Sequence, residues 1–374
     1  MILTQCAVCA TDLGLSLGKK CGRCSTRYCG PACQKQHWDG GHKDLCKKMK
    51  KTGGAEQYNA NKKYSEAVAV AAEKCAEDVQ GQTCYICTQA LHWKTKEGLV
   101  RGCACRGTSG FAHVSCLAEQ AKILVAEAEE NNLLGTERFE KIWARWYNCS
   151  LCEQYYHGEV KCALGWACWK THVGRQVDGP KMNAMAQLAN GLSETQQHEV
   201  ALSVREAELS TLRRLGQTEE QINNSKANLA FSYECLGRHE EALVLRRELY
   251  AWGVTFKLPT DEIIIYASNL AVSLKDNNRF EEARCFLRER IAEGFHRTLG
   301  VDHLQVMKMR AYYAQALSDD DRPSRDDLVE AIGIYEDLSS QTRRVLGGSH
   351  PFTGATQQNL LHVRWKLARL DAHS

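Results

Sequence analysis

Cysteine and histidine residues at short, regular spacings are the groups in this sequence best suited to chemistry. Fourteen of the nineteen cysteines fall into two separate arrays, and one histidine completes each array. The first array comprises Cys6, Cys9, Cys21, Cys24, Cys29, Cys33, His42 and Cys46. The second array comprises Cys84, Cys87, Cys103, Cys105, His113, Cys116, Cys149 and Cys152. Because zinc binds four such ligands and a Cys-x2-Cys turn presents two thiolates to one ion, each array predicts two zinc ions.

Zinc in such arrays is structural rather than catalytic. Protein ligands would fill all four coordination positions of each ion, so no position remains for a water molecule or a substrate. Disulfide bonds are the alternative use of many cysteines, but they are typical of small secreted domains. This chain has 374 residues, and no signal-peptide pattern precedes Cys6. We therefore expect four zinc ions as cofactors, and we find no phosphate-binding loop or nucleophilic triad that would indicate another chemistry.

The composition favours a soluble protein in a reducing compartment. Hydrophobic residues make up 44% of the chain and charged residues 25%, as in ordinary globular domains. The longest apolar run, residues 67–72, is too short to cross a bilayer, so we expect no membrane association. The abundance of thiols favours the cytoplasm, with the nucleus as the alternative.

The net charge of +3 is unevenly distributed along the chain. Residues 1–51 carry ten basic and three acidic side chains, and the basic ones include the lysine run at 47–51. Such a run is either a nucleic-acid or nuclear-import patch or a solvated helix end. We favour the helix end, because no pattern of alternating basic and aromatic residues accompanies the run. Nucleic acid is therefore not an expected partner.

The segment 27–34, Arg-Tyr-Cys-Gly-Pro-Ala-Cys-Gln, is followed by Trp38, His42 and Cys46. This pattern closely resembles a MYND zinc finger, a protein-interaction module, over residues 6–46. The resemblance implies two interleaved zinc sites. The first would consist of Cys6, Cys9, Cys29 and Cys33, and the second of Cys21, Cys24, His42 and Cys46. Interleaved zinc ions tie distant segments together, so a domain with a very small core can still fold.

One departure from the MYND pattern lies between Trp38 and His42, where three residues stand instead of the usual two. We expect Gly41 or its neighbouring glycine to absorb the extra residue as a local bulge. The departure leaves His37 as a rival ligand to His42. We favour His42 because the His-x3-Cys spacing places both groups on one helix face. Trp38 is expected to pack in the core of the finger.

The second array contains Cys103-Ala-Cys105-Arg-Gly, and a histidine occupies the fifth ligand position. This order resembles a RING-CH finger, also called RING-variant, over residues 84–156. The resemblance implies that one zinc is bound by Cys84, Cys87, His113 and Cys116. It implies that the other is bound by Cys103, Cys105, Cys149 and Cys152.

RING-CH proteins are typically ubiquitin ligases, which dock a charged ubiquitin-conjugating enzyme and orient its thioester without covalent chemistry of their own. Ile86 stands between the first two ligands, where the family has an apolar residue that contacts the conjugating enzyme. Gln120 stands where the family commonly has a tryptophan on its docking helix, which weighs against ligase activity. Trp143 and Trp146 are expected to pack in the core.

From about residue 185 the sequence has a period of 41 residues. The pairs Leu188-Ala189, Leu229-Ala230 and Leu270-Ala271 follow it, and so do Ala201, Ala242 and Ala283. A small alanine allows two antiparallel helices to approach closely. The pattern, together with turns such as 299–303 and 346–351, resembles the tetratricopeptide repeats of kinesin light chain. A last helix near residues 358–361 would cap the array.

We therefore expect a mostly α-helical chain with two small cross-brace zinc fingers followed by an α-solenoid. The expected division is a MYND-type finger at 6–46, a helical linker at 47–83, a RING-CH-type finger at 84–156, a linker at 157–184 and tetratricopeptide-like repeats at 185–370. His157, His172, Cys162 and Cys168 could form a further metal site in the second linker, but their irregular spacing favours packing. The expected function is that of a RING-type ubiquitin ligase whose repeats recruit a protein client. The alternative is a non-enzymatic adaptor that only scaffolds protein–protein interactions.

Overall fold

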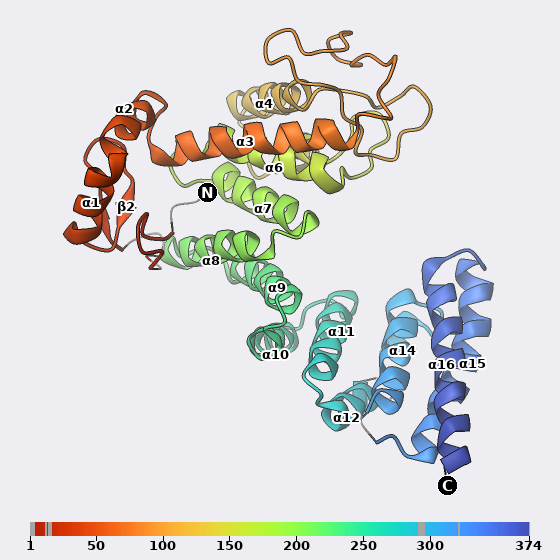
Figure 1. Ribbon diagram of the computed structural model, residues 1–374. Helices are drawn as coiled ribbons and strands as arrows, with labels where there is room; N and C mark the ends of the chain where they lie inside the picture. The colour runs from red at the N-terminus through yellow and green to blue at the C-terminus, as the bar shows by residue number, and fades with distance from the viewer. Residues whose placement is uncertain (1–3, 12, 14–16, 291–295, 321, 374) are drawn as a thin grey trace. The chain divides into compact units, whose positions relative to one another are not determined.

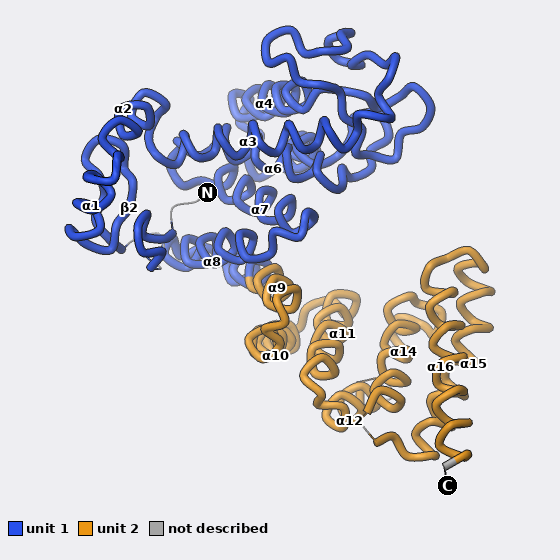
Figure 2. The backbone as a smooth tube through the Cα atoms, viewed as in Figure 1, with its two compact units in different colours: residues 1–225 blue, residues 226–374 orange. Residues whose placement is uncertain are grey.

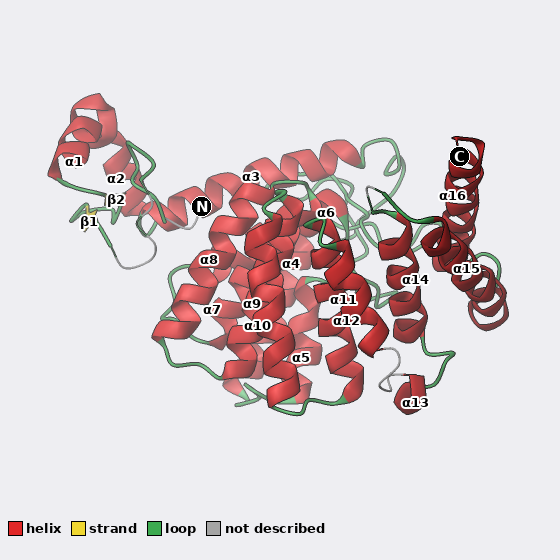
Figure 3. Cartoon of the chain, turned by 90° about the horizontal axis from the view of Figure 1, so that it is seen from below, coloured by secondary structure: helices red, strands yellow, loops and turns green. Residues whose placement is uncertain are grey.

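The computed structural model describes residues 4–11, 13, 17–290, 296–320 and 322–373 (Figure 1). The chain divides into two compact units, residues 1–225 and 226–374 (Figure 2). Helices dominate both units, and the paired strands belong to the first finger (Figure 3). The predicted fold class is confirmed: cysteine-rich regions near the amino terminus precede a mostly helical chain. Among the described residues, none of the helices is both long and apolar enough to cross a membrane.

The first finger is built from short elements. Strand β1 (Lys19–Lys20) pairs antiparallel with β2 (Arg27–Tyr28), and three short helical segments follow. These are α1 (Pro31–His37), the π-helical turn η1 (Trp38–His42) and α2 (Lys43–Lys51). Proline is favoured at the first position of a helix, where no backbone N–H is needed, and it stands there in α1. The few apolar side chains buried here include Leu13, Tyr28 and Met49, so the core is small.

Helix α3 (Ala55–Lys74) follows two glycines, Gly53 and Gly54, that both have positive φ angles. The second cysteine array then begins in a region that is largely irregular. It contains α4 (Val114–Glu130), α5 (Glu137–Trp143) and the 3-10 turn η2 (Ala144–Trp146). The Thr136 hydroxyl accepts a hydrogen bond from the Phe139 amide and so caps α5.

Helix α6 (Gly158–His172) lies at the centre of the core of this unit, between α3, α4 and α7 (Gly179–Glu194). The segment 157–184, which the sequence analysis assigned to a linker, thus holds α6 and the start of α7. Apolar residues surround α6 on all sides, which is the pattern of a fully buried helix. Cys162, Cys168 and His172 are buried in this packing, as expected for residues that pack rather than bind metal.

Helix pairs that repeat every 41 residues begin at α7. Helices α8 (His198–Arg214), α10 (His239–Thr255) and α12 (Phe280–Arg290) begin 41 residues apart, and so do α9 (Glu219–Cys235) and α11 (Thr260–Asp276). The three predicted seam alanines, Ala201, Ala242 and Ala283, are fully buried. The sequence period is therefore confirmed as a repeat of helical hairpins, and α9 runs across the boundary between the two units.

The second unit continues with α13 (His296–Leu299), α14 (Leu304–Ser318), α15 (Arg325–Leu346) and α16 (Pro351–His373). Ser324 and Asp327 form a reciprocal capping box at the start of α15. Side chains of α11, α14, α15 and α16 share one hydrophobic core. Helix α16 includes the residues predicted to form the last helix, near 358–361.

Candidate metal centres

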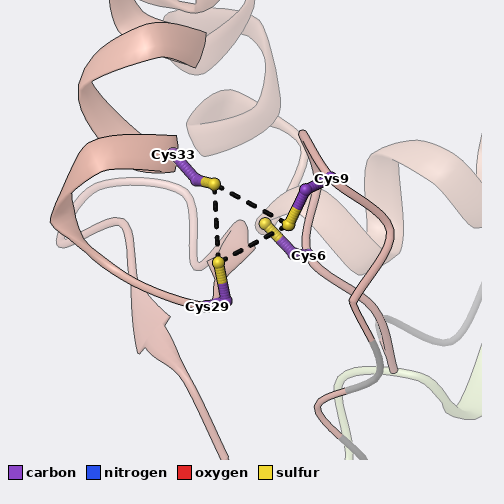
Figure 4. Close-up of side chains that lie close together, drawn as sticks. All are labelled: Cys6, Cys9, Cys29 and Cys33. Carbon is purple, nitrogen blue, oxygen red and sulfur yellow. Dashed lines mark hydrogen bonds between the residues drawn. The ribbon is translucent and has the colours of Figure 1, made fainter.

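The first group of ligands joins a turn, a strand end and a helix. Cys6 and Cys9 lie in one turn, Cys29 follows β2, and Cys33 lies in α1 (Figure 4). The Sγ atom of Cys29 is 3.5 Å from that of Cys9 and 3.4 Å from that of Cys33, while Cys33 and Cys9 are 3.8 Å apart. A tetrahedron with Zn–S bonds of about 2.3 Å has edges of about 3.8 Å. The thiolates thus fit around one zinc ion.

The second group, Cys21, Cys24, His42 and Cys46, is entirely buried. Its Sγ atoms from Cys21 and Cys46 are 3.7 Å apart, and His42 Nε2 is 3.4 Å from Cys24 Sγ. His37 takes no part in the group. Its Nδ1 instead shares a hydrogen bond of 2.9 Å with the Tyr28 hydroxyl, and its ring stacks on that of His42. The structure therefore brings His42, and not His37, to the cysteines.

The extra residue before His42 is absorbed at Gly41, whose φ angle is 105° within the π-helical turn η1. Glycine adopts a positive φ angle easily, so the bulge causes no backbone strain at this position. His42 and Cys46 then share one helix face, as the spacing predicts. Trp38 differs from the expectation, because its side chain is 37% exposed rather than buried in the core. The π turn leaves the Trp38 ring beside the His42 ring, with the two centroids 6.2 Å apart.

The third group forms at the start of α4. His113 is the residue that precedes this helix and Cys116 lies in its first turn, while Cys84 and Cys87 lie in an earlier turn. His113 Nδ1 is 3.3 Å from Cys87 Sγ and 3.6 Å from Cys116 Sγ. Its Nε2 lies 3.4 Å from the Ala90 carbonyl oxygen, an acceptor that would fix the ring with Nδ1 free to bind metal.

The fourth group joins residues that lie far apart in the sequence: Cys103 and Cys105 meet Cys149 and Cys152. The Sγ atoms of Cys105 and Cys149 are 3.8 Å apart, the length of a zinc–thiolate tetrahedron edge. Gly110 packs against this site. Its φ angle is 84°, and a Cβ atom there would lie 2.6 Å from the Cys105 Cβ, so only glycine fits.

Local electrostatics favours the protonation state that zinc requires at Cys6, His42 and His113, whereas the pKa of other ligand thiols is raised, that of Cys103 to about 11, mainly by burial. Burial raises the pKa of the Cys6 thiol, but backbone hydrogen bonds from Cys9, Cys29 and Val8 outweigh it and lower the pKa to about 6. Burial lowers the pKa of His42 and of His113, which favours the neutral imidazole. Within each of the four groups the ligand atoms lie within 4.8 Å of one another. Four zinc ions therefore fit the chain, and each would contribute folding energy to its finger.

The turns that carry the third and fourth groups also present apolar side chains to solvent. Ile86, between Cys84 and Cys87, is 36% exposed. Leu151 stands at the equivalent place between Cys149 and Cys152 and is 51% exposed. The preceding residues, Tyr85 and Ser150, share a hydrogen bond of 3.0 Å between their hydroxyl groups, so the two turns lie side by side. Leu151 was not among the residues predicted from the sequence, although its position within a Cys-x2-Cys turn was a sufficient signal.

The other residues of this finger that the sequence analysis discussed, two tryptophans and Gln120, are buried or half-buried. Trp143 and Trp146 are buried in the core, as predicted, and their rings are 6.4 Å apart between centroids. Gln120 lies half-buried on α4. We refer to Ile86 and Leu151 together as the paired turn tips.

Comparison with known proteins supports both fingers. Residues 6–46 match the family model described as MYND finger, and residues 84–132 match that of the RING-variant domain. Cys149 and Cys152 lie beyond the second match, and the fold brings them to the fourth site. A curated relative, ubiquitin carboxyl-terminal hydrolase 19 of Arabidopsis thaliana, is 47% identical over 49 residues. That match covers 13% of this chain and only 7% of the relative.

Two solved structures are similar to part of the chain. A putative kinesin light chain with nearly identical TPR-like repeats from Podosopora anserina has a TM-score of 0.43 and 17% identity, covering 62% of this chain and 97% of its own. BtubC (BKLC) from P. vanneervenii has a TM-score of 0.37 and 14% identity, covering 70% and 90%. The repeat assignment rests on the 41-residue helix spacing of this chain itself. The chain is thus a multi-module protein with two zinc-finger modules and tetratricopeptide-like repeats.

Proposed function

We propose that this chain is a RING-type E3 ubiquitin ligase that uses its second finger to dock a charged ubiquitin-conjugating enzyme. The observation that carries the proposal is the pair of exposed apolar residues, Ile86 and Leu151, on adjacent zinc-binding turns. Two apolar side chains on rigid, metal-held turns form a small preorganised surface. Such a surface loses little conformational entropy when a partner binds.

The proposed role requires no nucleophile from this chain. The thioester of the conjugating enzyme supplies the reactive bond, and the ligase contributes by holding that enzyme in a productive orientation. Zinc has a structural role here, because four protein ligands surround each position. The match to a ubiquitin hydrolase covers 7% of that enzyme, and we assign no hydrolase activity from it.

The repeats would supply client recognition. Tetratricopeptide-like arrays present helix faces that bind segments of other proteins. Of the described helices, α11, α14, α15 and α16 form a continuous core that would keep such a face rigid. We propose that a protein client binds to these repeats and so receives ubiquitin from the docked enzyme.

A non-enzymatic adaptor is the second candidate, and Gln120 favours it. This half-buried residue occupies the place on α4 where RING-CH fingers commonly have a tryptophan for docking. An amide offers less apolar contact than an indole, so binding of the conjugating enzyme would depend more strongly on the paired turn tips. In the adaptor, all the modules would bind proteins without ubiquitin transfer.

Ubiquitin discharge from a panel of charged conjugating enzymes tests the proposal. The wild-type chain should accelerate discharge with at least one enzyme. Ile86→Ala and Leu151→Ala should each reduce that acceleration about 10- to 100-fold, the range for a central interface residue, while zinc content is unchanged. Leu215→Ala, at an exposed leucine in the turn after α8, is the matched control and should retain full activity. A wild-type chain inactive with every enzyme would favour the adaptor.

A further inference from the structure

A cavity of about 430 Å³ lies within the first unit, where the first finger meets the helices. Segments far apart in the sequence line it. Lys20 and Arg27 come from the finger strands, Glu56 from the first turn of α3, Lys181 from α7 and Arg214 from the end of α8. This volume is within the range of small-molecule binding sites. The cavity is separate from the zinc sites and from the paired turn tips.

The lining of this cavity is positively charged. It holds four basic side chains, Lys20, Arg27, Lys181 and Arg214, against one carboxylate, Glu56. The first turn of α3 adds the positive end of a 20-residue helix. Electrostatic repulsion among these four basic side chains destabilises the folded chain. A bound anion would remove that repulsion.

Two of the basic groups are held by hydrogen bonds to backbone carbonyls, one of them buried and the other half-buried. Arg27 is only 4% exposed, and its guanidinium donates to the backbone carbonyls of Leu13 and Leu17. Lys181 Nζ donates to the Val173 and Arg175 carbonyls at 2.9 and 3.0 Å. Those bonds use two of the three N–H donors of the ammonium group. Burial lowers the pKa of Lys181, although the nearby Glu56 and Asp178 carboxylates oppose this shift.

An indole N–H without an acceptor adds a separate observation. Trp169 lines the cavity and is 2% exposed, and its Nε1 atom has no hydrogen-bond partner among the described residues. A buried donor left without an acceptor costs free energy. An anion that entered the cavity and reached this N–H would supply the missing acceptor.

We infer that this cavity binds a small anion that carries more than one phosphate group. Two guanidinium and two ammonium groups within one small space match the charge density of such a ligand, and guanidinium groups bind phosphate oxygens in pairs. Because its walls come from the finger and from α3, α6, α7 and α8, the bound anion would join the finger to the helices. This inference does not depend on ligase activity.

Calorimetric titration of the zinc-loaded full chain with inorganic pyrophosphate tests the inference. We expect saturable binding with one site per chain, a higher unfolding temperature and weaker binding at higher salt. Zinc content measured after the titration should be unchanged, which separates binding in the cavity from removal of metal. An unsaturable or salt-independent response would overturn the inference.

A pair of matched double variants locates the binding. Lys20→Gln with Arg214→Gln removes two exposed charges of the lining and should weaken pyrophosphate binding about tenfold or more. Lys19→Gln with Arg213→Gln removes the neighbouring exposed charges outside the lining and should leave the affinity unchanged. Equal weakening in both variants would show that the anion is held by general surface charge. Citrate serves as the carboxylate comparison, and binding of citrate as tight as that of pyrophosphate would overturn the phosphate assignment.

Discussion

His37 and His42 are separated by five positions in the first finger, yet their environments differ completely. His42 Nε2 approaches the Cys24 sulfur at 3.4 Å, whereas His37 shares a hydrogen bond with Tyr28. The sequence alone favours His42 through its His-x3-Cys spacing and leaves His37 as a rival ligand. These distances place His42 in the candidate zinc site and His37 outside it.

Replacing each histidine in turn tests this distinction. His42→Ala removes one of four ligands and should lower the zinc content of the purified chain from four ions to three. His37→Ala should retain four zinc ions and should lose only about 1 kcal/mol of stability with its hydrogen bond. Elemental analysis of both variants gives the result. Loss of zinc in His37→Ala with four ions retained in His42→Ala would reverse the assignment.

At the scale of elements, the closest packing in the first unit is that of α6 against α7. A Cβ atom on Gly165 would lie 2.9 Å from the Gln187 carbonyl oxygen, and one on Gly191 would lie 2.8 Å from the Cys162 Cα. Both neighbours are backbone atoms, which cannot move without shifting a helix. Glycine on each helix therefore sets how closely the two axes approach.

Gly191→Ala should consequently destabilise the first unit. We expect a loss of about 1–3 kcal/mol, the usual cost of overpacking a close contact. Gly333→Ala provides the matched control, since Gly333 lies within α15 and a Cβ there meets nothing within 4 Å. That variant should gain about 0.5–1 kcal/mol, because alanine is the better helix former. Thermal unfolding followed by circular dichroism measures both changes, and equal effects of the two substitutions would contradict the packing argument.

At the scale of the whole molecule, the second finger does not have a core of its own. One hydrophobic cluster unites Phe111, Leu117 and Trp146 of this region with buried side chains of α3, α6, α7 and α8. The second unit has separate clusters formed by its own helices. Sequence analysis divides the chain into a finger followed by repeats, whereas the packing joins the finger to the first helical hairpin.

Cys103→Ser should therefore affect more than the finger that contains it. Removing one thiolate weakens a site whose metal contributes on the order of 10 kcal/mol, and the shared core should loosen with it. We expect faster hydrogen exchange in α6, α7 and α8, with exchange in α14, α15 and α16 unchanged. Cys285→Ser, at an exposed cysteine in the second unit, is the control and should alter neither set. Unchanged exchange in α6 would indicate that the finger unfolds independently.

Features that depend on local spacing could be predicted from the amino-acid sequence. Cys-x2-Cys turns bring two thiolates together over a few residues, and the 41-residue period places one helical hairpin after another. Both follow from bond geometry and helix pitch, so they need no knowledge of distant contacts. The resemblance to the two finger families added a prediction of which ligands share each zinc ion.

Which groups meet across long stretches of chain could not be predicted before the fold was known. The exclusion of His37, the central place of α6, the pairing of Ile86 with Leu151 and the charged cavity all depend on tertiary contacts. The apolar segment 162–169 has the same composition whether it links two domains or fills a core. Whether such a segment is buried depends on how all segments of the chain compete for burial during folding. The sequence of the segment alone does not contain that information.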